Sequence, residues 1–335
     1  MFSVKLSILD QSPVSVGATP KQALEATIEL AELADELGYI RYWTAEHHDM
    51  EGLASPAPDL MLGMIGQRTK RIRIGSGAVL LPNYRPYNIA ERYNLLATLF
   101  PGRVDLGIGR APGGTAEVSM ALTDNFLKQV REMPDKLDEL LHFLKNDFPE
   151  ENMFSRISAS PVPEEPPIPW LLGTSEKSAQ LAAEKGLDYV FGDFMSKADG
   201  PEILQSYRDQ FQQKHPDKQP NTIVTVYAIC AETTEEAKEI AASSHLWKIK
   251  HDKLHVDKRV PTIGEAKEYM YSDKELASIA RLKNKQLVGN PKEVKAQLEE
   301  IQAAYETDEI MIVTITHSYE ARKKSYQLLA EECGL

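Results

Sequence analysis

Short strand-like segments alternate with amphipathic helix-like segments along the whole chain, and this alternation limits the possible folds more than any other feature. Apolar segments of strand length recur eight times, and most are followed by a segment with helical periodicity. The predicted strands are residues 4–9, 39–44, 72–81, 104–108, 168–172, 188–191, 223–231 and 309–314. Because strand–helix–strand connections return to a sheet with parallel, right-handed pairing, this order predicts a parallel sheet surrounded by helices.

The helical pattern is clearest in the first predicted helix. Leu30, Ala34 and Leu37 occupy the i, i+4 and i+7 positions of one apolar helix face. Gly38 follows directly, and glycine is common just past a helix end. The predicted helices are residues 20–37, 59–67, 88–100, a segment within 125–145, 175–186, 201–214, a helix near 291, and 319–332.

Such a chain can form an open doubly wound sheet or a closed (β/α)8 barrel, the TIM barrel. Turns of similar length, with no break between two half-sheets, favour the barrel. A minimal barrel needs about 250 residues, so roughly 85 of the 335 residues remain for insertions. The clearest surplus is residues 232–285, a charged, helix-prone segment between the seventh strand and the last strand–helix unit. We therefore predict an α/β fold with one TIM-barrel domain over 1–335 and a helical insertion at 232–285.

The composition excludes several classes of protein. With 38 Lys and Arg against 50 Asp and Glu, the formal net charge is −12, which argues against a nucleic-acid partner because phosphate neutralisation needs a basic surface. Two cysteines, Cys230 and Cys333, are too few for a disulfide framework. No apolar run approaches the ~18 residues of a membrane span, and no signal-peptide pattern appears. We therefore expect a cytoplasmic protein without a membrane partner.

Polar residues and glycines gather where the predicted strands end. In a TIM barrel the working residues follow the C-terminal ends of the strands. The corresponding segments are 10–12, 46–49, 81–85, 109–115, 173–175 and 192–194. We expect the functional site among them.

Glu46, His47, His48 and Asp49 form a run after the second predicted strand. Neighbouring side chains on an extended segment point to opposite faces, so His47 and His48 are poorly placed to share an ion, and we predict no metal site. The run is equally consistent with polar residues that simply end a strand. If His47 reaches the mouth of the barrel, an imidazole with a pKa near neutrality can exchange protons there.

Two segments are candidates for binding an anionic group. The glycines of 107–114 match neither a dinucleotide fingerprint nor a Walker loop, but small residues there would let a ligand approach while Arg110 pairs with a phosphate. Gly173, Thr174 and Ser175 end a strand and begin a helix whose free N–H groups suit a phosphate. A flexible turn and ordinary helix caps are the alternative interpretations. Taken together, the two segments favour a phosphate site.

The run Gly75-Ser76-Gly77-Ala78 lies inside the third predicted strand. Glycine weakens a strand, so the run indicates a bulge, the close approach of a flat group to the backbone, or tight packing against a helix. The residues themselves leave these interpretations open.

Several of these segments, in this order, resemble the bacterial luciferase-like family of flavin-dependent monooxygenases. The resemblance rests on residues 9–13, 42–48, 75–82, 101–113 and 173–186, and it extends over nearly the whole chain. Each segment alone is weakly specific, whereas the segments in register are specific. The chain is most similar to the single-chain luciferase-like oxidoreductases.

The resemblance implies a TIM barrel that binds FMN at its C-terminal mouth. By the family pattern, the phosphate-binding positions are Arg110, Thr174, Ser175 and Ser178, with Gly173 beside them. This agrees with the phosphate site expected from the residues themselves.

A second set of residues matches the family positions around the flavin ring. Gly77 and Ala78 match the place where the family has a non-prolyl cis peptide beneath the isoalloxazine. Glu46 matches a residue beside the flavin, and His47 matches the histidine that luciferase needs for flavin chemistry. The resemblance therefore implies that His47 and Glu46 are catalytic and that Gly77 and Ala78 bind the cofactor.

The chain also departs from the luciferase pattern. Gly109 stands in place of the reactive cysteine, Gly113 in place of a tyrosine, and Thr174 in place of a glutamate. Asp193 lies where many near relatives have histidine. These differences argue against light emission and long-chain aldehyde specificity, but they leave flavin binding intact.

The activity that the resemblance implies is that of a two-component monooxygenase. A separate flavin reductase would supply reduced FMN, and the protein would use it with dioxygen to oxygenate a small organic substrate while excluding water. His47 would manage protons at the flavin, and residues 250–285 would form a lid. The family also implies a homodimer.

Three alternatives remain. A deazaflavin-dependent enzyme of the same fold would transfer hydride without dioxygen; its cofactor has a longer acidic tail, and the sequence shows no additional basic patch for it, which favours FMN. A non-catalytic flavin-binding protein would not need His47. A barrel without a flavin would stay colourless when FMN is added.

Overall fold

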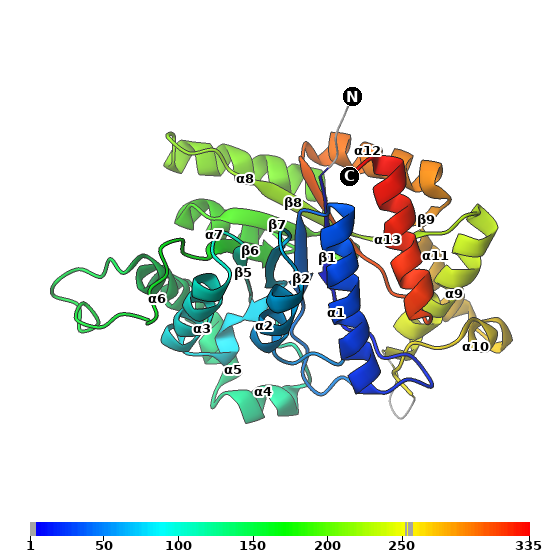
Figure 1. The fold of residues 1–335 in the computed structure, drawn as a ribbon, viewed down its shortest axis with the longest axis horizontal. Helices are drawn as coiled ribbons and strands as arrows, with labels where there is room; N and C mark the ends of the chain where they lie inside the picture. Colours follow the sequence, from blue (N-terminus) through cyan, green and yellow to red (C-terminus); the bar gives the residue numbers. More distant parts are fainter. Residues whose placement is uncertain (1–4, 252, 254–256) are drawn as a thin grey trace.

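The computed structural model describes residues 5–251, 253 and 257–335. Within these residues, eight parallel strands close into a barrel, because β10 pairs with both β1 and β8 (Figure 1). Around the barrel the strands are β1 (Lys5–Asp10), β2 (Arg41–Thr44), β3 (Arg73–Ser76), β5 (Val104–Gly109), β6 (Ile168–Gly173), β7 (Asp188–Gly192), β8 (Thr222–Cys230) and β10 (Glu309–Val313). The predicted TIM barrel is confirmed.

Helices surround the barrel and follow most of its strands (Figure 1). They are α1 (Pro20–Leu37), α2 (Pro58–Arg68), α3 (Pro86–Leu99), α4 (Ala116–Leu122), α5 (Phe126–Arg131), α6 (Met133–Lys145), α7 (Glu176–Lys185), α8 (Gly200–Lys214), α9 (Thr234–His251), α10 (Ile263–Glu268), α11 (Asp273–Lys283), α12 (Pro291–Tyr305) and α13 (Tyr319–Cys333). Local sequence sets their ends. Thr19 and Gln22 form a capping box at the start of α1, and Gly38, with a φ of 92°, ends that helix.

Several elements differ from their predictions, among them α4, which was not predicted. The predicted strand 72–81 is divided into β3 and the short β4 (Val79–Leu80), because the Gly77–Ala78 segment interrupts it. The helix predicted within 125–145 consists of α5 and α6, with a proline in the first turn of α6. The strand β9 (Gln286–Gly289), which extends the sheet from the end of β8, has only four residues and no alternating pattern that predicts it.

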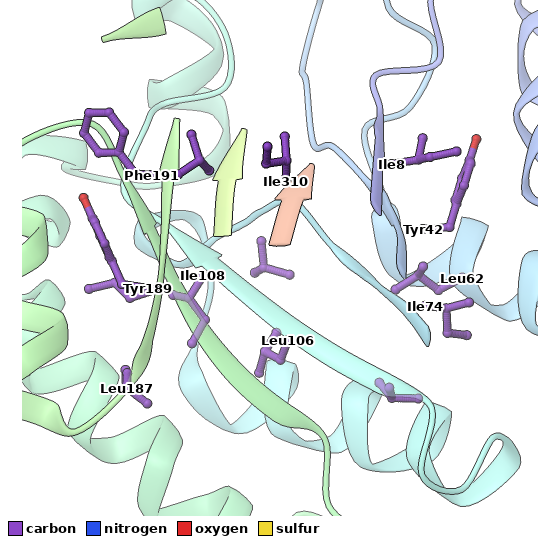
Figure 2. Packing of buried hydrophobic residues seen from close by; sticks show 14 of the residues in the cluster. Ile8, Tyr42, Leu62, Ile74, Leu106, Ile108, Leu187, Tyr189, Phe191 and Ile310 are labelled. Carbon is purple, nitrogen blue, oxygen red and sulfur yellow. The ribbon is translucent and has the colours of Figure 1, made fainter. Parts of the chain in front are cut away.

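Side chains of the barrel strands alternate between two hydrophobic clusters, as the period of a strand requires. Ile8 and Ile74 point outward and pack in the layer between the barrel and the helices (Figure 2). Leu9 and Trp43 belong to a second cluster inside the barrel. There the rings of Trp43 and Trp170 meet edge to face with their centroids 6.0 Å apart. Aromatic rings therefore fill the barrel beneath its C-terminal mouth.

The N-terminal end of the barrel contains a buried network of charges. Arg41 Nη1 lies 2.8 Å from Asp105 Oδ2, and Arg41 Nε lies 2.9 Å from Glu309 Oε1. Arg73 Nη2 lies 2.7 Å from Asp105 Oδ1. The buried Asp105 carboxylate also accepts a hydrogen bond of 3.1 Å from Trp43 Nε1. Paired side chains thus seal this end, which is the stabilising face of a TIM barrel.

The predicted insertion, 232–285, contains α9, α10 and α11 and lies between β8 and β9. Trp247 of α9 and Val260 pack in the cluster inside the barrel. Val260 N donates to Val14 O at 2.8 Å, and Val16 N donates to Val260 O at 2.9 Å. The insertion therefore covers part of the C-terminal mouth.

Parts of two predicted elements lie outside the described residues. Residues 252 and 254–256 belong to the predicted lid, and residue 4 begins the first predicted strand. Opening and closing of the lid stays a prediction.

Candidate active site

The loops that follow β2, β3 and β5 are bound to one another at the C-terminal mouth. Gly77 N donates to Thr44 O at 2.8 Å, and His48 N donates to Gly113 O at 2.8 Å. These bonds bring the 46–49 run, the Gly77–Ala78 segment and the glycine-rich loop after β5 into one place. The 46–49 run and the glycine-rich loop were predicted to follow strand ends, and the fold confirms this. The Gly77–Ala78 segment was predicted inside a strand, whereas β3 ends at Ser76.

Glu46 is buried and holds three donors. Its Oε1 lies 2.7 Å from His48 Nε2 and accepts from the Tyr84 hydroxyl at 3.0 Å, while its Oε2 accepts from Leu80 N at 3.0 Å. Burial and the neighbouring Glu46 raise the pKa of Tyr84, so its hydroxyl remains a donor. The carboxylate therefore ties the loops after β2 and β4 together, which is the geometry of a positioning residue.

His47 reaches the mouth and has an unusual environment. Its backbone N donates to Ser55 O at 3.0 Å, while its buried Nδ1 has no hydrogen-bond partner among the described residues. Burial, together with the nearby His251, His48 and Lys248, lowers the pKa of His47 to about 4. The expectation of a pKa near neutrality is therefore wrong, because the site is desolvated and surrounded by cationic groups. The imidazole is neutral at pH 7.

Other buried polar atoms near the ends of β1 and β2 also lack partners within the described part of the chain. They are Gln11 Oε1, Thr44 Oγ1 and Ser55 Oγ. Nearly all buried polar groups in proteins are hydrogen-bonded, so these atoms together with His47 Nδ1 mark a place where a polar ligand fits. Thr44 and Ser55 were not predicted as site residues. Thr44 is the last residue of the predicted strand 39–44, so it lies at the C-terminal end of the barrel, where the site was expected.

The peptide bond between Gly77 and Ala78 is cis, as the resemblance implied. A Cβ atom on Gly77 would lie 2.4 Å from Leu9 Cδ1, so a larger residue would require the Leu9 side chain to move. A Cβ atom on Gly109 would lie 3.0 Å from the Cβ of Ala78. Small residues therefore let β1, β4 and β5 pack closely around this segment.

The phosphate-site candidates lie on neighbouring strands. β5 and β6 are paired up to Ile108 and Leu171, and Arg110 follows directly after β5. Arg110 is exposed, and it makes no hydrogen bond or ion pair within the described ranges. Thr174 follows at the end of β6. Arg110 and Thr174 therefore directly follow two paired strands, and their joint binding of a phosphate stays a prediction.

Ser178 has a different environment from the other phosphate-site candidates. Its Oγ donates to Ser175 O at 2.7 Å and accepts from Ser175 N at 3.3 Å. It also lies 2.9 Å from the hydroxyl of Tyr189, whose pKa burial raises to about 12. A Cβ on Gly173 would lie 2.1 Å from Ser178 Oγ. Ser178 thus fixes the start of α7, and Thr174 and Ser175 are the hydroxyls nearer the loop.

The insertion contributes residues to this site that the sequence analysis did not assign to it. Lys248 and His251, in the last turn of α9, lie close enough to affect the charge state of His47. The sequence placed a lid at 250–285, which includes His251, but it gave Lys248 no role beyond the basic end of a helical segment.

Among the described residues, no group of three or more His, Cys, Asp or Glu side chains has an arrangement that could hold a metal ion. None of the described helices combines the length and apolar character needed to cross a membrane.

Comparison with other sequences gives matches that span the chain. The sequence model of a family described as luciferase-like monooxygenase matches residues 4–307. YceB of Bacillus subtilis strain 168, named as an uncharacterized protein, is 42% identical over 328 residues, which are 98% of this chain and 99% of YceB. N-acetyl-S-alkylcysteine monooxygenase of the same strain is 34% identical over 332 residues, 98% of each chain.

Solved structures also match nearly the whole chain. The crystal structure of apo-MsnO8 has a TM-score of 0.86 and 34% identity, and the match covers 100% of this chain and 98% of that one. The oxygenating constituent of 3,6-diketocamphane monooxygenase from Pseudomonas putida, solved with FMN, has a TM-score of 0.73 and 19% identity, covering 98% and 97%. An F420-dependent secondary alcohol dehydrogenase has a TM-score of 0.65 and 15% identity, covering 99% of each chain. At such low identities the last two show a shared fold.

Proposed function

The chain belongs to the luciferase-like monooxygenase family, and on this basis we propose that it is the oxygenase component of a two-component, FMN-dependent monooxygenase. The overall reaction would convert a small organic substrate, dioxygen and reduced FMN into oxygenated substrate, water and oxidised FMN. The observation that carries the proposal is the unpartnered His47 Nδ1, buried at the mouth beside other unpartnered polar atoms. Such a group calls for a polar ligand.

The residues present fit FMN. Arg110 and the hydroxyls of Thr174 and Ser175 would hold the phosphate, since an exposed guanidinium and a helix start both favour an anion. The Gly77–Ala78 backbone offers a surface without long side chains for a flat ring. When bound, reduced FMN supplies the two electrons that dioxygen activation needs.

His47 would act at the reacting end of the site. Because its imidazole is neutral at pH 7, Nδ1 can either accept a proton or donate one, depending on the tautomer. Its low pKa makes it a weak base, so it would orient and stabilise a polar group instead of holding a proton for long. Glu46 would be a positioning residue, because its oxygens are already engaged by Tyr84, His48 and Leu80.

The insertion would keep water out of the reaction. Trp247 packs among the residues inside the barrel, and its Nε1 donates to Lys258 O at 2.8 Å. A Cβ on Gly52 would lie 2.1 Å from Lys258 O, so the loop after β2 fits closely beneath this segment. Residues 250–285 would therefore act as the lid of the site.

A separate flavin reductase would be a partner. Two similar proteins have names that describe one component of a larger system. One is the oxygenase component of a flavin-dependent trigonelline monooxygenase from Acinetobacter baylyi, 24% identical over 234 residues, which are 68% of this chain and 65% of that protein. The other is the oxygenating constituent of the diketocamphane enzyme.

A second copy of this chain would be the other partner, docked on α2 and α3. Leu60 and Met64, one turn apart on α2, are 71% and 55% exposed, and Leu95 and Leu99 of α3 are 48% and 54% exposed. Because α2 and α3 are neighbours, these side chains form an apolar surface of the kind that marks an interface. We assign it to the homodimer.

The alternative with a specific observation in its favour is a deazaflavin-dependent hydride transfer, because an F420-dependent dehydrogenase shares the fold. A non-catalytic flavin-binding role is the other alternative. FMN is favoured because Arg110, Thr174 and Ser175 provide for one phosphate group.

Anaerobic titration with FMN, reduced FMN and reduced F420, followed by a pulse of air, separates these functions. The proposal predicts tighter binding of reduced FMN than of the other two, and an oxygen-dependent absorbance transient after the pulse. Tight binding of F420 without reaction with dioxygen would support hydride transfer. If His47→Ala changes neither the flavin binding nor the response to air, the non-catalytic role is supported. If none of the three cofactors binds, a flavin function is refuted.

A further inference from the structure

A cavity of about 40 Å³ lies where the insertion meets the barrel mouth. The barrel contributes Phe194 after β7, Tyr227 of β8 and Ile315 after β10. The insertion contributes Trp247 of α9 and Leu282 of α11. The cavity therefore exists only because the insertion covers the mouth, and changes in the insertion alter its shape.

The walls of the cavity are largely apolar, and its size is limited. The rings of Phe194 and Tyr227 pack edge to face with their centroids 4.8 Å apart, which fixes one wall. One water molecule needs a cavity volume of about 10–15 Å³, so a cavity of about 40 Å³ accommodates about three non-hydrogen atoms. A short hydrocarbon segment fits this space, and a large ring does not.

Two polar residues at the edge of the cavity, Lys285 and His245, are paired or uncharged. The ammonium group of Lys285 lies 2.8 Å from Ser196 O and 3.5 Å from Asp193 Oδ1. His245 Nε2 lies 2.7 Å from Gln286 Oε1. Burial lowers the pKa of His245, so its imidazole is neutral at pH 7. The part of the edge that Lys285 and His245 form therefore suits an uncharged group.

The cavity adjoins the candidate active site. Lys248 borders it, and the same side chain lies close enough to His47 to affect its charge state. Trp247 forms a wall of the cavity and also packs in the cluster inside the barrel. The cavity therefore lies on the side of the candidate site that the insertion covers.

We propose that this cavity receives an uncharged alkyl group of the substrate, about three carbon atoms long, and that it sets the chain-length specificity of the enzyme. The assignment rests on the proposed oxygenase function, since it describes one end of that substrate. Leu282 is the residue chosen to test this, because it is a half-buried aliphatic side chain that the insertion contributes to the lining.

The test is isothermal titration calorimetry of the protein, flavin-free and with FMN, with N-acetyl-S-alkylcysteines from methyl to hexyl. These probes are chosen because a relative 34% identical to this chain is named for such compounds. Affinity is expected to rise about fourfold per methylene up to propyl, then to level off. Leu282→Trp should move the plateau to methyl, and Leu282→Ala should move it beyond propyl. Leu276→Trp and Leu276→Ala, on the exposed face of α11, are the matched controls and should leave the profile unchanged.

The same chain-length profile in the wild type and both Leu282 variants would overturn the assignment, as would the absence of binding by every probe. A shift in the Leu276 variants equal to that in the Leu282 variants would also overturn it. Titration with reduced FMN tests the proposed function separately. If the chain-length shifts appear but reduced FMN does not bind, the cavity assignment stands and the oxygenase function fails. If reduced FMN binds but the chain-length shifts are absent, the cavity assignment fails and the oxygenase function stands.

Discussion

The low pKa of His47 makes the stability of the protein depend on pH in a way that can be calculated. The pKa is about 4 in the folded chain and 6.5 as the ordinary value. The unfolded chain therefore binds more protons between these values, so folded-state stability is lost as the pH falls below 6.5. Through His47 alone, the loss between pH 7 and pH 5 is about 2 kcal/mol, and it approaches about 3 kcal/mol near pH 4.

Urea unfolding of the wild type and His47→Gln at pH 7 and pH 5 measures this contribution. Any effect of the substitution on packing cancels in the comparison between the two pH values. The variant should therefore lose about 2 kcal/mol less than the wild type. His47→Asn, which is also uncharged, is the control and should match His47→Gln in pH dependence. An equal loss in wild type and both variants would refute the argument that His47 is desolvated and neutral.

Four further predictions concern the site, the barrel and the interface. His47→Ala should slow substrate oxygenation by about 10²–10⁴-fold, while FMN binding measured by fluorescence is retained. Arg110→Ala should weaken FMN binding by about 10–100-fold but leave riboflavin binding unchanged, because only FMN carries the phosphate. Asp105→Asn should lower the melting temperature by about 4–7 °C in calorimetry, whereas the exposed Asp59→Asn should lower it by less than about 1 °C. Leu99→Glu should convert a dimer to a monomer in light scattering, and an unchanged mass would contradict the assigned interface.

The sequence was sufficient to predict the barrel because the periodicity of each element is local. Ile8 and Leu9 belong to opposite faces of β1, as alternation requires, and they pack in different clusters. The strand order in the barrel then follows the chain order. Because all the strands are parallel, Glu46, His47 and Arg110, which each follow a strand, lie at the same end of the barrel. The Gly77–Ala78 geometry came from the resemblance, because the residues themselves left several interpretations open.

Properties that depend on distant segments were not predictable in this way. The pKa of His47 depends on burial beneath α9 and on Lys248 and His251, which lie about two hundred positions away in the chain. The sequence gives no indication of where the basic end of α9 packs. The unpartnered hydroxyl of Thr44 is likewise a property of the assembled mouth, since threonine in a strand usually signals only β propensity.

The charged network at the N-terminal end of the barrel has a consequence for how the protein is made. Arg41 holds Asp105, 64 positions later in the chain, and Glu309, 268 positions later. At about 5–20 residues per second, a ribosome adds Glu309 about 13–54 s after Arg41. Throughout that time β1 lacks its neighbour on one side, and Arg41 has only the first of its two carboxylates. The nascent chain therefore carries an unfinished sheet edge for most of its synthesis, and the cellular machinery that guards nascent chains encounters an open barrel rather than a closed one.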